Sequence, residues 1–264
     1  VLDTKAAELG VTLTEEDEAE FDRLWQENVD YYEDEETLLN VMAEQHLSKE
    51  LYRYMVDVSL LYDRLYESMY GVDGAELDEE EAVAFMEGND YMRVKHILLM
   101  SIDDEGNSFS EEELNDRYEQ ITGFLEQLRA VEDPAEREAL FDELMNEHSE
   151  DTGLAAYPEG YVFTYGDMVD EFYQASLSLE EYGLSDIVES SYGYHLILRL
   201  PMRADDVPIN SDMSIRSLAA ETMLESNMDS WIEEAELVYA EGFENVSLNE
   251  LLPIIETETE YAAG

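Results

Sequence analysis

Two short apolar runs set the strongest limit on how this chain can fold. They are residues 93–100, RVKHILLM, and residues 193–200, GYHLILRL. Both are rich in aliphatic side chains, and a polar loop ends the first while Pro201 ends the second, which favours strands over helices. The sequence on either side of this pair has helical patterning. We therefore expect a β-containing insert, 92–202, between two helical flanks.

The helical flanks are predicted from the spacing of their apolar side chains. In residues 51–70 these recur at i, i+3, i+4 and i+7, as on one face of a helix: Leu51, Tyr54, Met55, Val58, Leu61, Tyr62, Leu65 and Met69. Thr14 is expected to cap an earlier helix, and helical patterning returns from Ser214 to about Ala240. Because each flank has an apolar stripe to bury, we expect the flanks to pack together as one domain and most of their tyrosines to be core residues.

Within the insert, the sequence predicts two longer helices and smaller elements. A helix is expected over 111–131. Asp133 followed by Pro134 and Glu136 is a strong signal for the start of a second helix, which extends to about His148. A short strand over 161–164 and a short helix over 169–175 follow. The fold class expected from these patterns is α+β.

Charge excludes several classes of partner. The chain has 13 Lys and Arg against 68 Asp and Glu, so its net charge is −55. A protein this acidic does not bind nucleic acid by neutralising phosphates, nor does it adhere to an anionic membrane surface. The hydrophobic share of 45% contradicts a disordered chain. With no cysteine, disulfides, thiolate nucleophiles and cysteine-ligated metals are excluded.

The beginning of the sequence bears on localisation. The chain starts at Val1 without a basic and apolar leader, and no apolar run approaches the ~18–20 residues that a membrane span needs. We expect the natural protein to begin earlier, with a signal or lipid-anchor segment. Membrane contact is then expected only through that anchor.

Two histidines are the first candidates for a functional site. His96 and His195 each lie inside one of the two predicted strands. A single histidine in a strand is most often a core residue whose nitrogens are hydrogen-bonded. Two of them at the two ends of one α/β unit favour a shared site, because neighbouring strands would place their imidazoles against each other.

The insert resembles a parvulin-type peptidyl-prolyl isomerase domain. The matching pieces are 93–99, 141–151, 160–179, 184–188 and 192–200, in the family's order and spacing. The flanks resemble, less specifically, the split chaperone domain of exported bacterial foldases of the PrsA and SurA kind. This resemblance implies a four-stranded antiparallel sheet with helices at 92–202. It also implies an all-α chaperone domain made of 1–91 and 203–252, followed by an acidic tail, 253–264.

The resemblance also implies a site. His96 and His195 match the family's paired histidines, and Asp151 falls where related enzymes have Cys or Asp facing the twisting amide; these are the expected catalytic residues. The expected substrate-binding residues match positions around the family's proline pocket: Tyr161, Phe163, Met168, Phe172 and Tyr192. Met168 and Phe172 are expected four residues apart on the short helix. Rotation about an X–Pro bond faces a barrier of ~18–20 kcal/mol and needs no proton transfer, so we expect the histidines to organise hydrogen bonds. Neither a cofactor nor a metal is implied.

Two departures from the family pattern change what is expected. Relatives have a Gly-Gly-Asp-Leu-Gly-like run before the Phe, whereas this chain has YPEGYVF at 157–163, so either Gly160 or Tyr161 replaces the usual pocket Leu. Phosphate-directed parvulins have Lys and Arg in the loop after the first strand. Here that loop, 101–108, contains three acids, which would repel a phosphoserine. We therefore expect no phospho-specificity.

The expected function is that of an isomerase and chaperone for exported proteins. Its partners would be unfolded or partly folded exported polypeptides that contain X–Pro bonds, and the chain would act alone or as a homodimer. The expected location is extracytoplasmic, either anchored to the cell surface as a lipoprotein or secreted. One alternative is a degenerate holdase that binds extended peptides without isomerising them. A third hypothesis, an acidic cation-buffering surface protein, rests on charge alone, because runs such as 33–36 and 79–81 lack the loop of a dedicated Ca²⁺ site.

Overall fold

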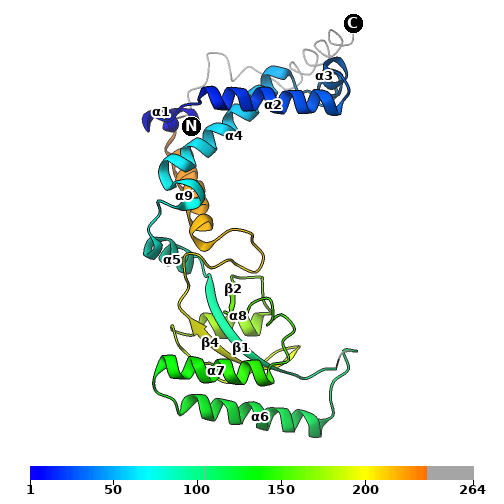
Figure 1. The fold of residues 1–264 in the computed structure, drawn as a ribbon, viewed down its shortest axis with the longest axis vertical. Helices are drawn as coiled ribbons and strands as arrows, with labels where there is room; N and C mark the ends of the chain where they lie inside the picture. The colour runs from blue at the N-terminus through cyan, green and yellow to red at the C-terminus, as the bar shows by residue number, and fades with distance from the viewer. Residues whose placement is uncertain (104, 237–264) are drawn as a thin grey trace. The chain divides into compact units, whose positions relative to one another are not determined.

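The computed structural model describes residues 1–103 and 105–236, and the chain divides into two compact units (Figure 1). Among the described residues, the helical unit comprises Val1–Glu76 and 221–236, and the sheet unit comprises Leu77–Ala220. The predicted insert, 92–202, lies inside the sheet unit. The predicted acidic tail, 253–264, and the end of the helix predicted to about Ala240 lie outside the described residues.

The helical unit is built from amphipathic helices with side-chain caps. Its described helices are α1 (Leu2–Glu8), α2 (Glu15–Tyr31), α3 (Glu35–Glu44), α4 (Lys49–Tyr70), the short 3-10 turn Val72–Gly74 and, from Glu221 onward, α9 (Ile215–Glu234). The cap predicted at Thr14 is confirmed, because its hydroxyl accepts the N–H of Asp17 while the Asp17 carboxylate accepts the N–H of Thr14. Helices α2 and α3 share a small hydrophobic core, which consists of Phe21, Trp25, Leu38 and Met42.

Helix α4 buries less of its apolar stripe than predicted. Leu61 and Leu65 are buried, but Leu51, Tyr54 and Met55 are exposed by 45%, 58% and 55%. The expectation that most flank tyrosines are core residues is wrong for Tyr31 and Tyr54, and Tyr31 is 80% exposed. Helical periodicity identifies an apolar face, yet burial depends on a partner helix that covers it. In the described part of the chain, the N-terminal half of this face stays open to solvent.

The sheet unit contains the predicted four-stranded antiparallel sheet. Its strands are β1 (Met92–Met100), β2 (Tyr161–Phe163), β3 (Val188–Glu189) and β4 (Gly193–Leu200). Their order in the sheet is β2-β1-β4-β3, so the two long strands predicted from the apolar runs are central neighbours. Side chains alternate between the two faces of each strand.

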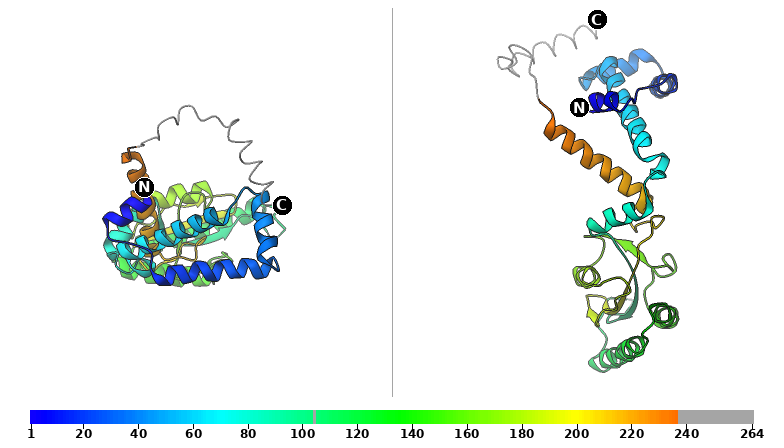
Figure 2. Two further views of the ribbon diagram at one scale, coloured as in Figure 1. Left: turned by 90° about the horizontal axis from the view of Figure 1, so that it is seen from above. Right: turned by 90° about the vertical axis from the view of Figure 1, so that its left-hand side faces the viewer.

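Helices cover both faces of this sheet (Figures 1 and 2). The described helices of the unit are α5 (Glu79–Gly88), α6 (Glu111–Arg129), α7 (Pro134–His148), α8 (Asp170–Leu177) and the beginning of α9. Helix α7 begins at Pro134 after the cap Asp133, as predicted. Helix α8 begins at Asp170, so Met168 lies in the turn before the helix rather than on it, which corrects the expectation.

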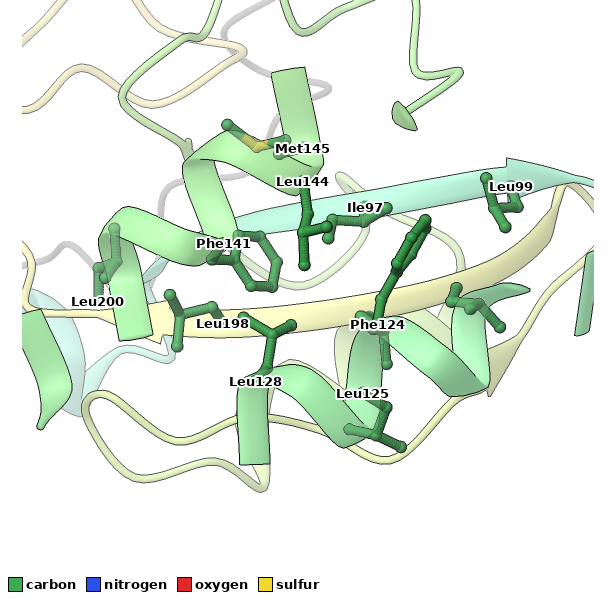
Figure 3. Packing of buried hydrophobic residues seen from close by; sticks show 12 residues of the cluster. Ile97, Leu99, Phe124, Leu125, Leu128, Phe141, Leu144, Met145, Leu198 and Leu200 are labelled. Atoms are coloured by element: carbon green, nitrogen blue, oxygen red, sulfur yellow. The ribbon is translucent and has the colours of Figure 1, made fainter. Parts of the chain in front are cut away.

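The main core lies between the sheet and the pair α6 and α7. Figure 3 shows side chains of both helices converging on β1 and β4. Ile97 and Leu99 of β1 face this core, whereas Met92 and Val94 face α8 in a second core. Each such fully buried aliphatic side chain stabilises the fold by about 1.5–3 kcal/mol, so β1 is anchored on both faces.

Two basic residues of β1 are also buried, and each has polar partners. Arg93 donates to the backbone carbonyls of Glu159 and Pro201. Lys95 donates to the carboxylates of Glu138 and Asp142 on α7, at 3.0 Å each. These bonds offset the cost of removing the charges from water, and loss of a partner would leave an uncompensated buried charge.

The described residues contain neither a membrane span nor a metal cluster. Within the described ranges, none of the helices combines the length and the apolar character needed to cross a bilayer. Across the same residues, no three His, Asp or Glu side chains are grouped as metal ligands.

Candidate functional site

Strand register brings the two histidines together. In the antiparallel pair, His96 lies opposite Ile197 and His195 lies opposite Leu98, so the two histidines are diagonal neighbours on one face of the sheet. Their Nδ1 atoms are 3.2 Å apart, and their ring planes differ by 12°. The prediction that the two imidazoles lie against each other is confirmed.

Asp151 closes one end of this pair. Its Oδ2 lies 3.0 Å from His96 Nε2 and accepts the hydroxyl of Tyr161 at 2.5 Å, while its Oδ1 accepts the N–H of Gly153 at 3.0 Å. Burial alone would raise the pKa of Asp151, but the hydrogen bonds from His96 and Tyr161 outweigh it and lower the pKa to about 2. The carboxylate is therefore ionised at neutral pH.

Ser190 closes the other end, and sequence reasoning missed it. Its Oγ lies 2.7 Å from His195 Nε2 and accepts the N–H of Tyr192 at 3.1 Å. Burial lowers the pKa of His195 to about 3, and the neighbouring His96 adds to the effect, so His195 is neutral at neutral pH. The only signal in the sequence was a hydroxyl in the turn before β4, which is too common to indicate a site.

These contacts define where the protons of the network lie. Ionised Asp151 can only accept, so the Nε2 of His96 carries a proton. With a single proton on the His96 ring, its Nδ1 accepts from the Nδ1–H of His195. Neutral His195 with its proton on Nδ1 has an unprotonated Nε2, so Ser190 Oγ donates its hydrogen to that nitrogen. Hydrogen bonds thus run in one direction, from Ser190 to Asp151, and select one tautomer of each histidine.

The network lines one wall of a cavity of about 530 Å³. Every predicted site residue except Phe163 lines this cavity. Sequence reasoning missed the remaining lining residues, which are Leu98, Met100, Thr152, Gly166, Asp167 and Val169. Leu98 and Met100 were within reach of prediction, because alternation along β1 puts them on the face of His96.

The apolar part of the cavity centres on Phe172. This ring is 2% exposed, and its centroid lies 5.0 Å from that of His96 and 5.4 Å from that of His195. Phe163 is fully buried and packs against Phe172 at a centroid distance of 5.8 Å. Phe163 therefore supports the wall rather than facing the cavity, whereas Met168 faces it directly.

Of the two residues left open by the sequence, Tyr161 lines the cavity and Gly160 does not. Gly160 has φ +105°, and a Cβ at this position would lie 2.7 Å from the carbonyl oxygen of Val94. Only glycine fits such a close approach. Tyr161 follows at the start of β2 and, because its hydroxyl bonds to Asp151, burial and that carboxylate raise its pKa.

The arrangement suits binding and hydrogen bonding better than proton transfer. A carboxylate with a pKa of about 2 is a weak base at neutral pH, and His195 stays neutral. The described lining includes the carboxylates of Asp151 and Asp167 and no Lys or Arg. The cavity can therefore hold an apolar ring against Met168 and Phe172 beside a polar wall of fixed orientation.

Comparisons with known proteins agree with this arrangement. Residues 96–200 match the family described as Rotamase, PPIC-type PPIase domain. The foldase protein PrsA of Halalkalibacterium halodurans is 34% identical over 132 residues, which cover 48% of this chain and 33% of that protein. The PrsA of Oceanobacillus iheyensis is 30% identical over 166 residues, 62% of this chain and 46% of that protein. The chain thus matches less than half the length of these two relatives.

A solved structure, the peptidylprolyl isomerase PrsA from Bacillus anthracis, is 19% identical and covers 91% of this chain and 96% of that chain, with a TM-score of 0.33. Because that score is low, the identification rests on the matched family and on the sequence relatives. The match begins at His96 and ends at Leu200, so it contains the whole hydrogen-bonded network and the cavity. Residues 96–200 therefore form a parvulin-type peptidyl-prolyl isomerase domain, in a chain that is similar to PrsA foldases.

Proposed function

We propose that this chain is a peptidyl-prolyl cis–trans isomerase and chaperone that assists the folding of exported proteins. The observation that carries the proposal is the cavity, in which the apolar side chains of Met168 and Phe172 lie beside the network of His96, His195 and Asp151. In this proposal the isomerase domain, 92–202, interrupts a helical chaperone domain formed by 1–91 and 203–252.

The proposed mechanism is binding of a twisted amide. The proline ring would pack against Met168 and Phe172, and Phe163 would support these two side chains from beneath. Tyr161 would lie on the polar side of the cavity and Tyr192 at its mouth. Asp151 would face the amide as it twists, and His96 and His195 would hold that wall in one hydrogen-bonding pattern. Rate enhancement then comes from contacts that are stronger with the twisted amide than with either planar isomer. The proposed chemistry needs no cofactor.

The helical unit is the proposed chaperone part. Support comes from Leu51, Tyr54 and Met55, exposed apolar side chains on one face of α4. Exposed apolar surface can hold unfolded segments, and flexible Met side chains adapt to many partners. The proposed partners are unfolded exported polypeptides that contain X–Pro bonds. The proposal also includes an extracytoplasmic location, a lipid anchor and a homodimer. The name foldase, which both curated relatives carry, supports the role in export.

The proposal excludes phosphorylated substrates. The cavity lining has two carboxylates, and the described residues of the loop after β1 include Asp103 and Glu105. A phosphoserine next to the proline would meet like charge on each of these sides.

Refolding of a protein whose slow step is proline isomerisation tests the proposal against its alternative, the degenerate holdase. We expect the wild-type chain to accelerate the slow phase, and His195→Ala to lose the acceleration while still suppressing aggregation of a client. If the wild-type chain suppresses aggregation without any acceleration, and His195→Ala performs equally, the holdase is the better description.

A further inference from the structure

A short segment before Asp151 takes the place of a strand at one edge of the sheet. Strand β2 pairs with β1 only at Met92, Arg93 and Val94, so the rest of this edge has no strand partner in the sheet. There, residues 149–151 run alongside β1. The N–H of Leu98 donates to Ser149 Oγ at 3.1 Å, and the N–H of Glu150 donates to the Leu98 carbonyl at 2.8 Å.

The side chain of Glu150 continues this pairing by one more bond. A turn begins directly after Asp151, so the main chain leaves the edge before it reaches Met100. The Glu150 carboxylate accepts the N–H of Met100 at 2.7 Å instead, in place of a backbone carbonyl. The segment is thereby bonded to β1 at both Leu98 and Met100, and an edge N–H that would otherwise lack a partner is satisfied.

Arg117 of α6 holds that carboxylate in place. Its Nη1 donates to the same oxygen of Glu150 at 2.6 Å, and its guanidinium lies over the ring of Phe109, 4.3 Å from the ring centroid. Charge-assisted bonds of this kind are stronger and more directional than neutral ones. Glu150 is therefore held in one orientation by both the strand and the helix.

We propose that Glu150, oriented by Arg117, is a positioning residue for the isomerase site. It holds the backbone next to Asp151 against β1, and so keeps the Asp151 carboxylate 3.0 Å from His96 Nε2. Through that contact it maintains the tautomers of both histidines. The inference rests on the proposed function where it concerns activity, and on geometry alone where it concerns the tautomers.

Two substitutions at Glu150 separate its proposed role from bulk packing. Glu150→Ala removes the acceptor for the Met100 N–H, whereas Glu150→Gln keeps an amide oxygen at the same position. We expect Glu150→Ala to lower kcat/KM for a proline peptide roughly 10- to 100-fold, the cost of a displaced catalytic group. We expect Glu150→Gln to stay within about threefold of wild type, because its oxygen still positions the segment.

The decisive readout is the protonation pattern of the imidazoles, measured by long-range ¹⁵N–¹H NMR on the full chain. We expect the wild type to show a proton on Nε2 of His96 and on Nδ1 of His195, Glu150→Gln to keep this pattern, and Glu150→Ala to lose it. His46, in the helical unit, serves as an internal reference. Arg129→Ala is the matched control, since Arg129 ends the same helix as Arg117 and makes an exposed ion pair with Asp186.

An unchanged tautomer pattern in folded Glu150→Ala would overturn the inference. Should that variant not fold, Arg117→Ala decides by the same readout, with loss of the pattern expected and its persistence contradictory. A wild-type chain without isomerase activity would defeat the proposed function instead, and the NMR comparison would still decide whether Glu150 positions Asp151.

Discussion

At the residue scale, burial favours the neutral form of both Asp151 and His195, yet only His195 is neutral. Asp151 remains ionised because hydrogen bonds from His96 and Tyr161 outweigh its burial, whereas burial keeps His195 neutral. Asp151 is thus a fixed acceptor at one end of the network, and His195 is a neutral ring within it. A site of this kind presents oriented dipoles to a substrate without exchanging protons with it, which is what rotation about an amide requires.

The first prediction concerns Asp151. Replacing it by Ala removes the acceptor for His96 and Tyr161, and we expect kcat/KM for a proline peptide to fall roughly tenfold or more. Asp151→Asn keeps an acceptor oxygen but not the charge, so its loss should be smaller. A steady-state comparison of the three proteins checks this order. Equal activity of Asp151→Ala and wild type would remove Asp151 from the proposed mechanism.

The second prediction concerns acid stability. The pKa of His195 is lowered to about 3 in the folded protein, so between pH 6.5 and 3 the unfolded state binds the extra proton and stability falls as pH falls. Between pH 7 and pH 5, protonation of this histidine in the unfolded state should lower the free energy of unfolding by about 2 kcal/mol. Chemical denaturation followed by NMR signals of β4 measures the loss. It should be smaller in His195→Asn, and an equal loss in both proteins would contradict the assignment.

At the scale of elements, the sequence predicted the helix starts, because these depend on residues that are neighbours in the chain. The start of α7 at Pro134 and the capping box of Thr14 could be predicted, because caps depend on neighbours in sequence. The strand register could not, although it decides the site: a slip of one residue would turn His96 to the opposite face. The resemblance to a family supplied what periodicity could not.

Contacts between distant segments account for the rest of what the sequence did not reveal. Glu150 bonds to Met100 and Arg117, which are far from it in the chain, and Ser190 meets His195 only because the turn before β4 folds back on the strand. Exposure of Leu51 on α4 depends on which helix covers it, and that is a property of the assembled unit.

The third prediction belongs to the edge strand β2. Gly160→Ala would place a Cβ 2.7 Å from the Val94 carbonyl, at φ +105°, so we expect the sheet unit to lose about 1–3 kcal/mol of stability. Gly123→Ala is the matched control. It lies within α6 with open space around its Cβ position, and there alanine should stabilise by about 1 kcal/mol. If urea unfolding shows that both substitutions change the free energy of unfolding in the same direction, this account is contradicted.

At the scale of the whole molecule, the charge of −55 acts on partners rather than on the chemistry. The cavity has an apolar wall beside a hydrogen-bonded polar wall, and its lining includes Asp151 and Asp167 and no Lys or Arg among the described residues. An acidic surface raises the local concentration of cationic segments and repels anionic ones. The chain should therefore favour basic clients over acidic ones with the same proline content.

The fourth prediction follows from that charge. For peptides that differ only in the residue before proline, kcat/KM should be highest with Lys, lower with Glu and lowest with phosphoserine. The differences should shrink as salt rises from 50 mM to 500 mM, because salt screens exposed charges. Competition between paired peptides in one sample measures the ratios directly. A preference for Glu or for phosphoserine would show that the acidic lining does not select the substrate.

The most direct test of the central claim is cis–trans exchange of a proline peptide, observed by two-dimensional NMR exchange spectroscopy with the full chain. Without catalyst, the two isomers interconvert over tens to hundreds of seconds, too slowly to give exchange peaks. We expect exchange peaks with wild-type protein and with Arg129→Ala, and strongly reduced peaks with Met168→Ala, which shortens the apolar wall of the cavity. A folded wild-type chain that produces no exchange peaks, across several residues preceding proline, would contradict the account.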